Sequence, residues 1–305
     1  MKILYAGSSQ SSSLILESLI AGSNEVIGVI SQPDRRSKRR ASAEPSYVSS
    51  VAEKYGVSVY KPQNLDENFK QTILQLKFDI LLVAAYGKIL PEWLLKTPSK
   101  DSINIHYSLL PKYRGASPIQ SALLNGEKIT GISIMRMTAG LDEGPVFIFH
   151  TQEILNSDNK NTLEKKLTSL SIKNIEKDLS NIYLDKIVPI KQDVKNISYC
   201  KKIDKLSGRI NFDQEGADSI LRKFKAYYGW PGLYFEWKEL KIKIHGIAIN
   251  KNNTSNTDNK FYFKDNLLVV KTVDKSIVIT HLQFPGKGII SSKDAANSYA
   301  DFFQE

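Results

Sequence analysis

The chain contains a long apolar segment at residues 78–85: Phe78-Asp79-Ile80-Leu81-Leu82-Val83-Ala84-Ala85. Apart from Asp79, every side chain is apolar, which is typical of a central strand buried on both faces of a parallel sheet. Further strands are predicted on either side of this segment, at residues 2–6, 25–31, 57–60, 102–106 and 131–137. The segment therefore predicts the middle of an α/β sheet.

Predicted helices separate most of these strands. Apolar residues recur at helical spacing between residues 14 and 20, and further helices are predicted at residues 45–55, 66–76, 118–124 and 161–184. Alternating strands and helices indicate a mostly parallel sheet with helices on both of its faces.

The pattern changes after residue 203. A predicted helix at residues 217–227 precedes short alternating strands at residues 233–237, 240–248, 260–263, 267–271 and 276–282. Turn signals spaced about 8 to 12 residues apart are typical of a small antiparallel barrel or sandwich. We therefore predict an α/β domain at residues 1–185, a linker at 186–203 and a β domain at 204–305.

The composition is basic. The chain has 305 residues, with 42 Lys and Arg against 32 Asp and Glu, for a net charge of +10. This excess favours nucleic acid or an anionic membrane face as a partner, although a lysine-rich surface without such a partner gives the same count. One cysteine allows no internal disulfide, and no apolar stretch reaches the roughly 20 residues of a membrane span. These features predict a soluble, cytoplasmic protein.

Several familiar binding motifs are missing. Gly7 follows the first predicted strand, but Ser8, Ser9 and Gln10 replace the rest of a dinucleotide-binding Gly-x-Gly-x-x-Gly motif. The four histidines lie far apart in the sequence without the spacing of zinc ligands. We therefore expect chemistry that needs no metal.

A polar pair occupies the strand predicted at residues 102–106. Asn104 and His106 are two residues apart, so their side chains project from the same face of the strand. The carboxyl ends of strands in an open α/β sheet border the ligand crevice, where such a pair is well positioned for chemistry. From spacing alone, the pair could also be the solvent-facing residues of an edge strand.

A second candidate lies in the glycine-rich loop after the strand at residues 131–137. Asp142 and Glu143 stand between Gly140 and Gly144, where acidic residues are commonly part of a turn. One of the two carboxylates could instead orient His106 across the crevice, since a neighbouring carboxylate stabilises an imidazolium.

The segment at residues 104–115 resembles the signature of the folate-dependent formyltransferases, in which Asn-x-His precedes Ser-Leu-Leu-Pro and Arg-Gly. Leu141-Asp142-Glu143-Gly144 resembles the second signature of that family. Matches at residues 32–35, 84–91, 118–120 and 230–232 narrow the resemblance to the branch that acts on methionyl-tRNA. The likeness extends from about residue 1 to about residue 300 in the same order.

The resemblance implies a Rossmann-like catalytic domain followed by a β-barrel of the oligonucleotide-binding kind that binds tRNA. It implies 10-formyltetrahydrofolate as the formyl donor, the amino group of methionine on initiator methionyl-tRNA as the acceptor, and no metal. Asn104 would stabilise the developing oxyanion, His106 would donate a second hydrogen bond, and Asp142 would hold His106 and relay a proton.

The resemblance also implies two binding segments and a monomer. The folate site would include the loop of Ser108, Leu109, Leu110 and Pro111, together with Tyr86 and Gly87 at the end of the preceding strand. A basic segment would contact the acceptor stem of the tRNA through Arg35, Arg36, Lys38, Arg39 and Arg40. Arginine suits this role because its planar fork can meet phosphates or base edges.

The chain departs from the family pattern at several points. Residues 8–11 are Ser-Ser-Gln-Ser, the basic segment at residues 35–40 lacks the usual glycines, and Ser121 stands where an arginine is common. Tyr228-Gly229 replaces the usual Asn-Pro before Trp230. None of these departures affects Asn104, His106 or Asp142.

Two other functions fit part of the sequence. A formyltransferase acting on a small amine, such as an amino sugar nucleotide, would share Asn104, His106 and Asp142 but would need neither the basic segment nor a basic second domain. A non-catalytic RNA-binding protein could keep the fold, and the intact trio argues against it.

Overall fold

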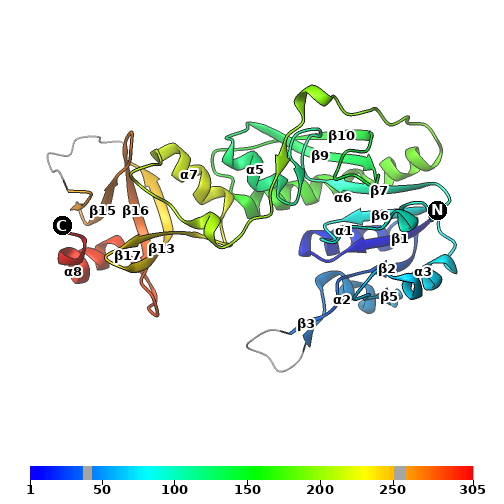
Figure 1. Cartoon of the computed structure of the whole chain (residues 1–305), viewed down its shortest axis with the longest axis horizontal. Coiled ribbons are helices and arrows are strands. Elements are labelled where there is room, and N and C mark those ends of the chain that lie inside the picture. Colours follow the sequence, from blue (N-terminus) through cyan, green and yellow to red (C-terminus); the bar gives the residue numbers. More distant parts are fainter. Residues whose placement is uncertain (37–42, 251–258, 305) are drawn as a thin grey trace. The chain divides into compact units, whose positions relative to one another are not determined.

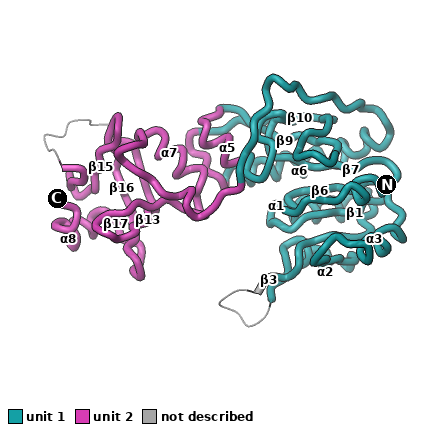
Figure 2. Tube along the Cα trace, viewed as in Figure 1, with its two compact units in different colours: residues 1–118, 128–155, 162–201 teal, residues 119–127, 156–161, 202–305 magenta. Residues whose placement is uncertain are grey.

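The computed structural model describes residues 1–36, 43–250 and 259–304, which form two compact units. Unit 1 comprises residues 1–118, 128–155 and 162–201, and unit 2 comprises residues 119–127, 156–161 and 202–305 (Figure 2).

Unit 1 is built on a seven-stranded sheet with the order β10-β9-β7-β6-β1-β2-β5 (Figure 1). Its strands are β1 (Lys2–Gly7), β2 (Glu25–Ile30), β5 (Val59–Tyr60), β6 (Ile80–Ala84), β7 (Asp101–His106), β9 (Ile129–Arg136) and β10 (Val146–Glu153). Strands β5, β2, β1, β6 and β7 pair in parallel, whereas β9 and β10 are antiparallel. The predicted mostly parallel sheet is confirmed, and β6, which was predicted as its buried central strand, is buried along its whole length.

The helices of this half of the chain follow the predicted pattern. They are α1 (Gln10–Ala21), α2 (Tyr47–Lys54), α3 (Glu67–Leu74), α4 (Glu92–Leu95), α5 (Pro118–Leu124) and α6 (Lys160–Tyr183). The segment at residues 161–184 forms one helix of 24 residues. The one-turn helix α4 and strand β10 were not predicted, because each is short or mixed in polarity.

The turn after β1 keeps one glycine, Gly7, and has serines where a dinucleotide-binding motif would have further glycines. A Cβ atom at Gly7 would lie 1.9 Å from Ser12 Oγ and 2.8 Å from the carbonyl oxygen of Ala84, so this position requires glycine. Ser9 caps α1, with its hydroxyl accepting a 3.1 Å hydrogen bond from the Ser12 amide. The turn that departs from the family pattern is therefore closed by its own hydrogen bonds.

Most of the predicted linker at residues 186–203 lies in unit 1. Within it, β11 (Tyr199–Cys200) pairs in parallel with β8 (Arg114–Gly115), and Ile190 forms an antiparallel bridge to Val146. A short 3-10 helix, η1, spans Val194–Asn196. The sequence pattern did not reveal these contacts because they involve two-residue strands without hydrophobic periodicity.

Unit 2 contains the predicted antiparallel sheet, which has the five predicted strands and an unpredicted sixth, β17. Their order is β12-β13-β16-β15-β14, with β17 beside β16. The strands are β12 (Leu233–Trp237), β13 (Leu240–Ile249), β14 (Phe261–Lys264), β15 (Leu267–Lys271), β16 (Ser276–Gln283) and β17 (Ile289–Ser291). Besides most of α5, its helices among the described residues are η2 (Leu206–Gly208), α7 (Ala217–Ala226) and the unpredicted α8 (Ser292–Phe303). Closure into a barrel stays a prediction.

Aromatic side chains form much of the core of unit 2. Phe261 contacts Phe235 at 5.5 Å, Trp237 at 4.5 Å and Phe303 at 5.4 Å between ring centroids. Phe303 brings the C-terminal helix α8 into this core, because its side chain is only 1% exposed. Edge and offset ring contacts of this kind stabilise a core beyond the area that they bury.

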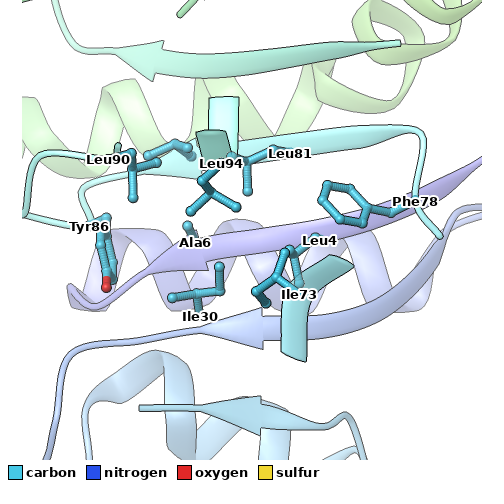
Figure 3. Packing of buried hydrophobic residues seen from close by; sticks show 10 residues of the cluster. Leu4, Ala6, Ile30, Ile73, Phe78, Leu81, Tyr86, Leu90 and Leu94 are labelled. Atoms are coloured by element: carbon cyan, nitrogen blue, oxygen red, sulfur yellow. The ribbon is translucent and has the colours of Figure 1, made fainter. Parts of the chain in front are cut away.

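A second core lies between the sheet of unit 1 and the segments around α3 and α4. It contains Leu4, Ala6, Ile30, Ile73, Phe78, Leu81, Val83, Tyr86, Leu90 and Leu94 (Figure 3). The Tyr86 side chain is 2% exposed, and its hydroxyl has no hydrogen-bond partner among the described residues. Burial raises the pKa of Tyr86 to about 12, so the phenol is neutral at physiological pH.

We expect Tyr86→Phe to raise the free energy of unfolding by about 1 kcal/mol, because an unpaired buried hydroxyl costs stability and phenylalanine keeps the ring. Tyr86→Ala should lower the free energy of unfolding by about 3–5 kcal/mol, since it removes the ring and leaves a cavity. Chemical denaturation of the two variants beside the wild type measures both changes. A clear loss of stability in the phenylalanine variant would show that the hydroxyl does have a partner.

Candidate active site

Strand β7 and the loop between β9 and β10 bring the three predicted polar residues together. Asn104 and His106 lie on β7, and the Asn104 Nδ2 atom is 3.4 Å from Asp142 Oδ1. The His106 Nδ1 atom is 3.7 Å from Asp142 Oδ2. One carboxylate thus faces both the amide and the imidazole, and it belongs to Asp142, the residue that the family resemblance implies as the partner of His106.

The surroundings of His106 fix which ring nitrogen carries a proton. Its Nε2 atom is 2.9 Å from the carbonyl oxygen of Tyr113, and the residue is 5% exposed. A carbonyl oxygen can only accept, so Nε2 is the donor in this hydrogen bond. The nitrogen that remains to face Asp142 is Nδ1.

Asp142 is held at both its side chain and its backbone. Its Oδ2 atom accepts a 2.8 Å hydrogen bond from the Gly115 amide, and its carbonyl oxygen accepts a 2.8 Å bond from Gln192 Nε2. Asp142 has a φ of 49°, in the left-handed region that aspartate tolerates better than most residues. Gln192 was not predicted, because it lies in the supposed linker 50 residues after Asp142.

The loop of residues 108–111 is anchored by alternate side chains. Ser108 is fully buried, with its hydroxyl donating a 2.6 Å bond to the Lys112 carbonyl. Leu110 is 4% exposed and packs with Met135 and Val146. Leu109 and Pro111 are half-buried, and the Leu110–Pro111 peptide bond is cis. Leu109 and Pro111 are therefore the side chains of this loop that remain partly accessible.

Tyr86 and Gly87 follow β6 at the carboxyl edge of the sheet. The Tyr86 carbonyl oxygen accepts a 2.8 Å hydrogen bond from Gln32 Nε2, while its ring packs in the core described above. Gly87 is exposed and has a φ of 80°, and a Cβ atom there would lie 2.9 Å from Gln32 Nε2. Because the ring of Tyr86 is buried, a ligand in this region would meet the backbone of Tyr86.

The basic segment is described only in part. The backbone of Arg35 and Arg36 forms β3, which pairs in an antiparallel manner with β4 (Ala43–Glu44). Lys38, Arg39 and Arg40 lie outside the described residues. Before this segment, Asp34 forms a 2.9 Å ion pair with Lys61. The structure therefore does not test whether the five basic residues lie near the trio.

The described residues contain neither a candidate metal site nor a helix that could cross a membrane. Over residues 1–36, 43–250 and 259–304, no three His, Cys, Asp or Glu side chains are grouped so that they could hold a metal ion. Within the same ranges, no helix has the length and hydropathy that a membrane crossing requires.

Comparisons with known proteins identify the same family in both halves of the chain. The formyl transferase family model matches residues 1–177, and the model of the formyl transferase C-terminal domain matches residues 202–300. A methionyl-tRNA formyltransferase from Buchnera aphidicola subsp. Acyrthosiphon pisum (strain Tuc7) is 37% identical over 308 residues, covering 100% of this chain and 98% of its own. A methionyl-tRNA formyltransferase from Caldicellulosiruptor saccharolyticus is 37% identical over 305 residues, with coverage of 98% and 97%.

A solved structure shares the fold. The N-formyltransferase from Helicobacter canadensis, crystallised with folinic acid and dTDP-3-aminofucose, aligns with a TM-score of 0.68 at 19% identity. The alignment covers 92% of this chain and 98% of that protein. At this level of identity, the likeness supports the fold alone.

Proposed function

We propose, from the premise that this chain belongs to the formyl transferase family, that it transfers the formyl group of 10-formyltetrahydrofolate to the amino group of methionine on initiator methionyl-tRNA. The observation that carries the proposal is the approach of one carboxylate, Asp142, to both Asn104 and His106 at the end of β7. The relatives that match over the full length, at 37% identity, are named for the tRNA reaction.

Asn104 is proposed as the oxyanion donor. Its 3.4 Å contact with Asp142 uses at most one of the two amide hydrogens, so the other can donate to the formyl oxygen as negative charge develops there. An amide donates without changing its protonation state. The fixed position of Asn104 on a buried strand means that little reorganisation is needed during the reaction.

His106 and Asp142 are proposed to handle the proton. Because the Tyr113 carbonyl holds Nε2–H, the second proton of a doubly protonated His106 is on Nδ1, from which it can be donated toward Asp142 or the formyl oxygen. The methionine nitrogen attacks the formyl carbon to give a tetrahedral intermediate with a negatively charged oxygen, and the bond from that carbon to N10 of the folate breaks as the intermediate collapses. The proton lost by the amine passes through Asp142 and ends on N10, so the step needs no oxidant or reductant.

The loop of Ser108, Leu109, Leu110 and Pro111, with Tyr86 and Gly87, is proposed as the folate site. Its anchored backbone supports the proposal, because Ser133 Oγ donates to the Ser108 carbonyl at 2.6 Å and accepts from the Leu110 amide at 3.0 Å. A preformed loop lowers the entropic cost of binding. Leu110 itself is in the core, so replacing it with a charged residue would destabilise the fold as well as any bound folate.

Reduced folate is therefore expected to bind the protein without tRNA. Because a ligand that binds only the folded state stabilises it, 5-formyltetrahydrofolate at about 100 times its dissociation constant should add roughly 2.7 kcal/mol to the free energy of unfolding. Thermal unfolding at increasing folate concentrations, with the oxidised parent folic acid as a comparison, measures the effect. An unfolding midpoint that stays constant across the titration would contradict the proposed folate site.

The basic segment at residues 35–40 and the C-terminal domain are proposed to bind the tRNA. The net charge of +10 and the resemblance described above support this assignment. We propose that the enzyme acts as a monomer in the cytoplasm, where its formylated product would enter translation initiation.

Transfer to a small amine is the second candidate. It would use the same Asn104, His106 and Asp142, so the geometry of the trio does not distinguish it from the first candidate. Competition between the two acceptors for one labelled formyl donor separates the candidates.

A further inference from the structure

We infer that Gln192 is a positioning residue for the proposed reaction, and that its side-chain amide fixes the loop that carries Asp142. The inference rests on the proposed function and extends it to a part of the chain that the sequence predicted to be a linker.

The side chain of Gln192 makes four hydrogen bonds. Its Oε1 atom accepts from Arg114 Nε at 3.0 Å and from Arg114 Nη2 at 2.8 Å. Its Nε2 atom donates to the carbonyl oxygens of Asp142 at 2.8 Å and Gly144 at 2.7 Å. Arginine can only donate and carbonyl oxygens can only accept, so the orientation of the amide is determined by its partners.

Arg114 makes this amide hard to replace. The arginine is 5% exposed, and the hydrogen bonds that the structure gives its guanidinium within the described residues are those to Gln192. A buried cation depends on its hydrogen-bond partners, because it has lost its hydration. Gln192 therefore joins a buried charge on one side to the backbone of the Asp142 loop on the other.

The same dipeptide, Arg114-Gly115, reaches Asp142 by two routes. Arg114 acts through Gln192 on the Asp142 carbonyl, and the Gly115 amide donates directly to the Asp142 carboxylate at 2.8 Å. The dipeptide forms β8 and is itself paired with β11 at Tyr199 and Cys200. Gly115 cannot carry a side chain here, since its Cβ atom would lie 2.4 Å from the Cys200 carbonyl oxygen.

This arrangement matters for chemistry because Asp142 must face two partners at once. Its carboxylate lies 3.4 Å from Asn104 Nδ2 and 3.7 Å from His106 Nδ1. The backbone of Asp142 itself is in the left-handed region. A misplacement of about 1 Å can cost a reaction about 10²-fold. Holding the carbonyls of Asp142 and Gly144 restrains both sides of the turn that aims this carboxylate.

The test uses Gln192→Glu and Gln192→Ala, with Gln71→Ala on α3 as the matched control. Gln71 is exposed, and its side-chain amide donates a 3.2 Å hydrogen bond to Glu67 on its own helix. Glutamate keeps the oxygens that accept from Arg114 and adds a charge that pairs with it, but a carboxylate cannot donate to the two carbonyls. The glutamate variant thus separates support of Arg114 from support of the Asp142 loop.

We expect kcat of formyl transfer to fall by about 10- to 100-fold in both Gln192 variants, with KM for folate and for tRNA changed by less than about threefold. The unfolding midpoint of Gln192→Glu should lie above that of Gln192→Ala, because glutamate still accepts from the buried Arg114 whereas alanine leaves it unpaired. Gln71→Ala should match the wild type in both measurements. Wild-type kcat in Gln192→Glu would overturn the inference.

Amide hydrogen exchange gives a readout that does not depend on activity. We expect the Gly115 amide, which donates to the Asp142 carboxylate, to exchange faster in both Gln192 variants than in the wild type. Unchanged protection in both variants would overturn the inference even if the proposed reaction is correct. A wild-type protein without formyl transfer, but with Gly115 protection that depends on Gln192, would contradict the proposed function and leave the positioning role intact.

Discussion

Asn104→Ala is expected to lower kcat of formyl transfer by about 10²–10³, the usual cost of removing one oxyanion donor. The methyl group of alanine cannot donate to the formyl oxygen, and the backbone of β7 keeps its pairing with β6 and β9. Binding of folate and tRNA should change little, because the lost interaction forms mainly in the transition state.

Asp142→Asn should also be severe, for a different reason. Asparagine keeps the shape and can still accept from the Gly115 amide, but it removes the negative charge that faces His106 and the oxygen that takes up the proton. Glu143 provides the matched control, because it is the neighbouring carboxylate of the same loop and is exposed. Glu143→Gln should retain nearly wild-type turnover.

Steady-state kinetics with charged initiator tRNA measure all three variants, and circular dichroism checks their folding. If Asn104→Ala or Asp142→Asn turns over within about threefold of the wild type, the chemistry has been assigned to the wrong residues. Equal losses in Asp142→Asn and Glu143→Gln would mean that the charge of the loop, and not the position of Asp142, is what matters.

Replacing Arg35, Arg36, Lys38, Arg39 and Arg40 by serine is expected to weaken tRNA binding by about 10²–10³ near 0.15 M salt if all five side chains contact phosphates. For each phosphate contact that is lost, tRNA binding releases fewer counterions. The slope of log affinity against log salt should therefore flatten by somewhat under one unit per contact. Folate binding should persist, because residues 108–111 and the trio are unchanged.

A charge-matched control separates a specific contact from a general loss of positive charge. Five exposed lysines of unit 1 provide it when they are replaced by serine together: Lys77, Lys165, Lys173, Lys177 and Lys186. Filter binding over a range of salt concentrations should show a much smaller change for this control. Unchanged tRNA affinity and slope in the variant of residues 35–40 would leave that segment without a role and shift attention to the C-terminal domain.

The features that the sequence predicted well are those with a strong period or a long apolar run. The buried strand β6, the alternation of Asn104 and His106 on β7 and the helix at residues 118–124 all follow from local patterns. In unit 2, β12 and β15 have the predicted bounds. The meeting of Asp142 with β7 could be anticipated only from the family resemblance, since spacing left Asp142 and Glu143 equivalent.

The rest depends on contacts between distant residues that leave no local pattern. Gln192 is one polar residue in an aperiodic segment, and its role appears only when β11 pairs with β8. Similarly, no local pattern indicates that the ring of Tyr86 packs among Leu4, Ile30 and Leu90 in the core, and its place in the folate site stays a prediction. The direction of a side chain beyond the end of a strand is set by tertiary packing, and a local sequence pattern does not predict it.

The most direct test of the account is transfer of radiolabelled formyl from 10-formyltetrahydrofolate, with charged initiator methionyl-tRNA and an excess of a dTDP-linked amino sugar in one reaction. We predict label on the methionine of the tRNA, released together with methionine on deacylation. The amount of labelled tRNA should be the same with and without the amino sugar. Label on the amino sugar with none on the tRNA would contradict it.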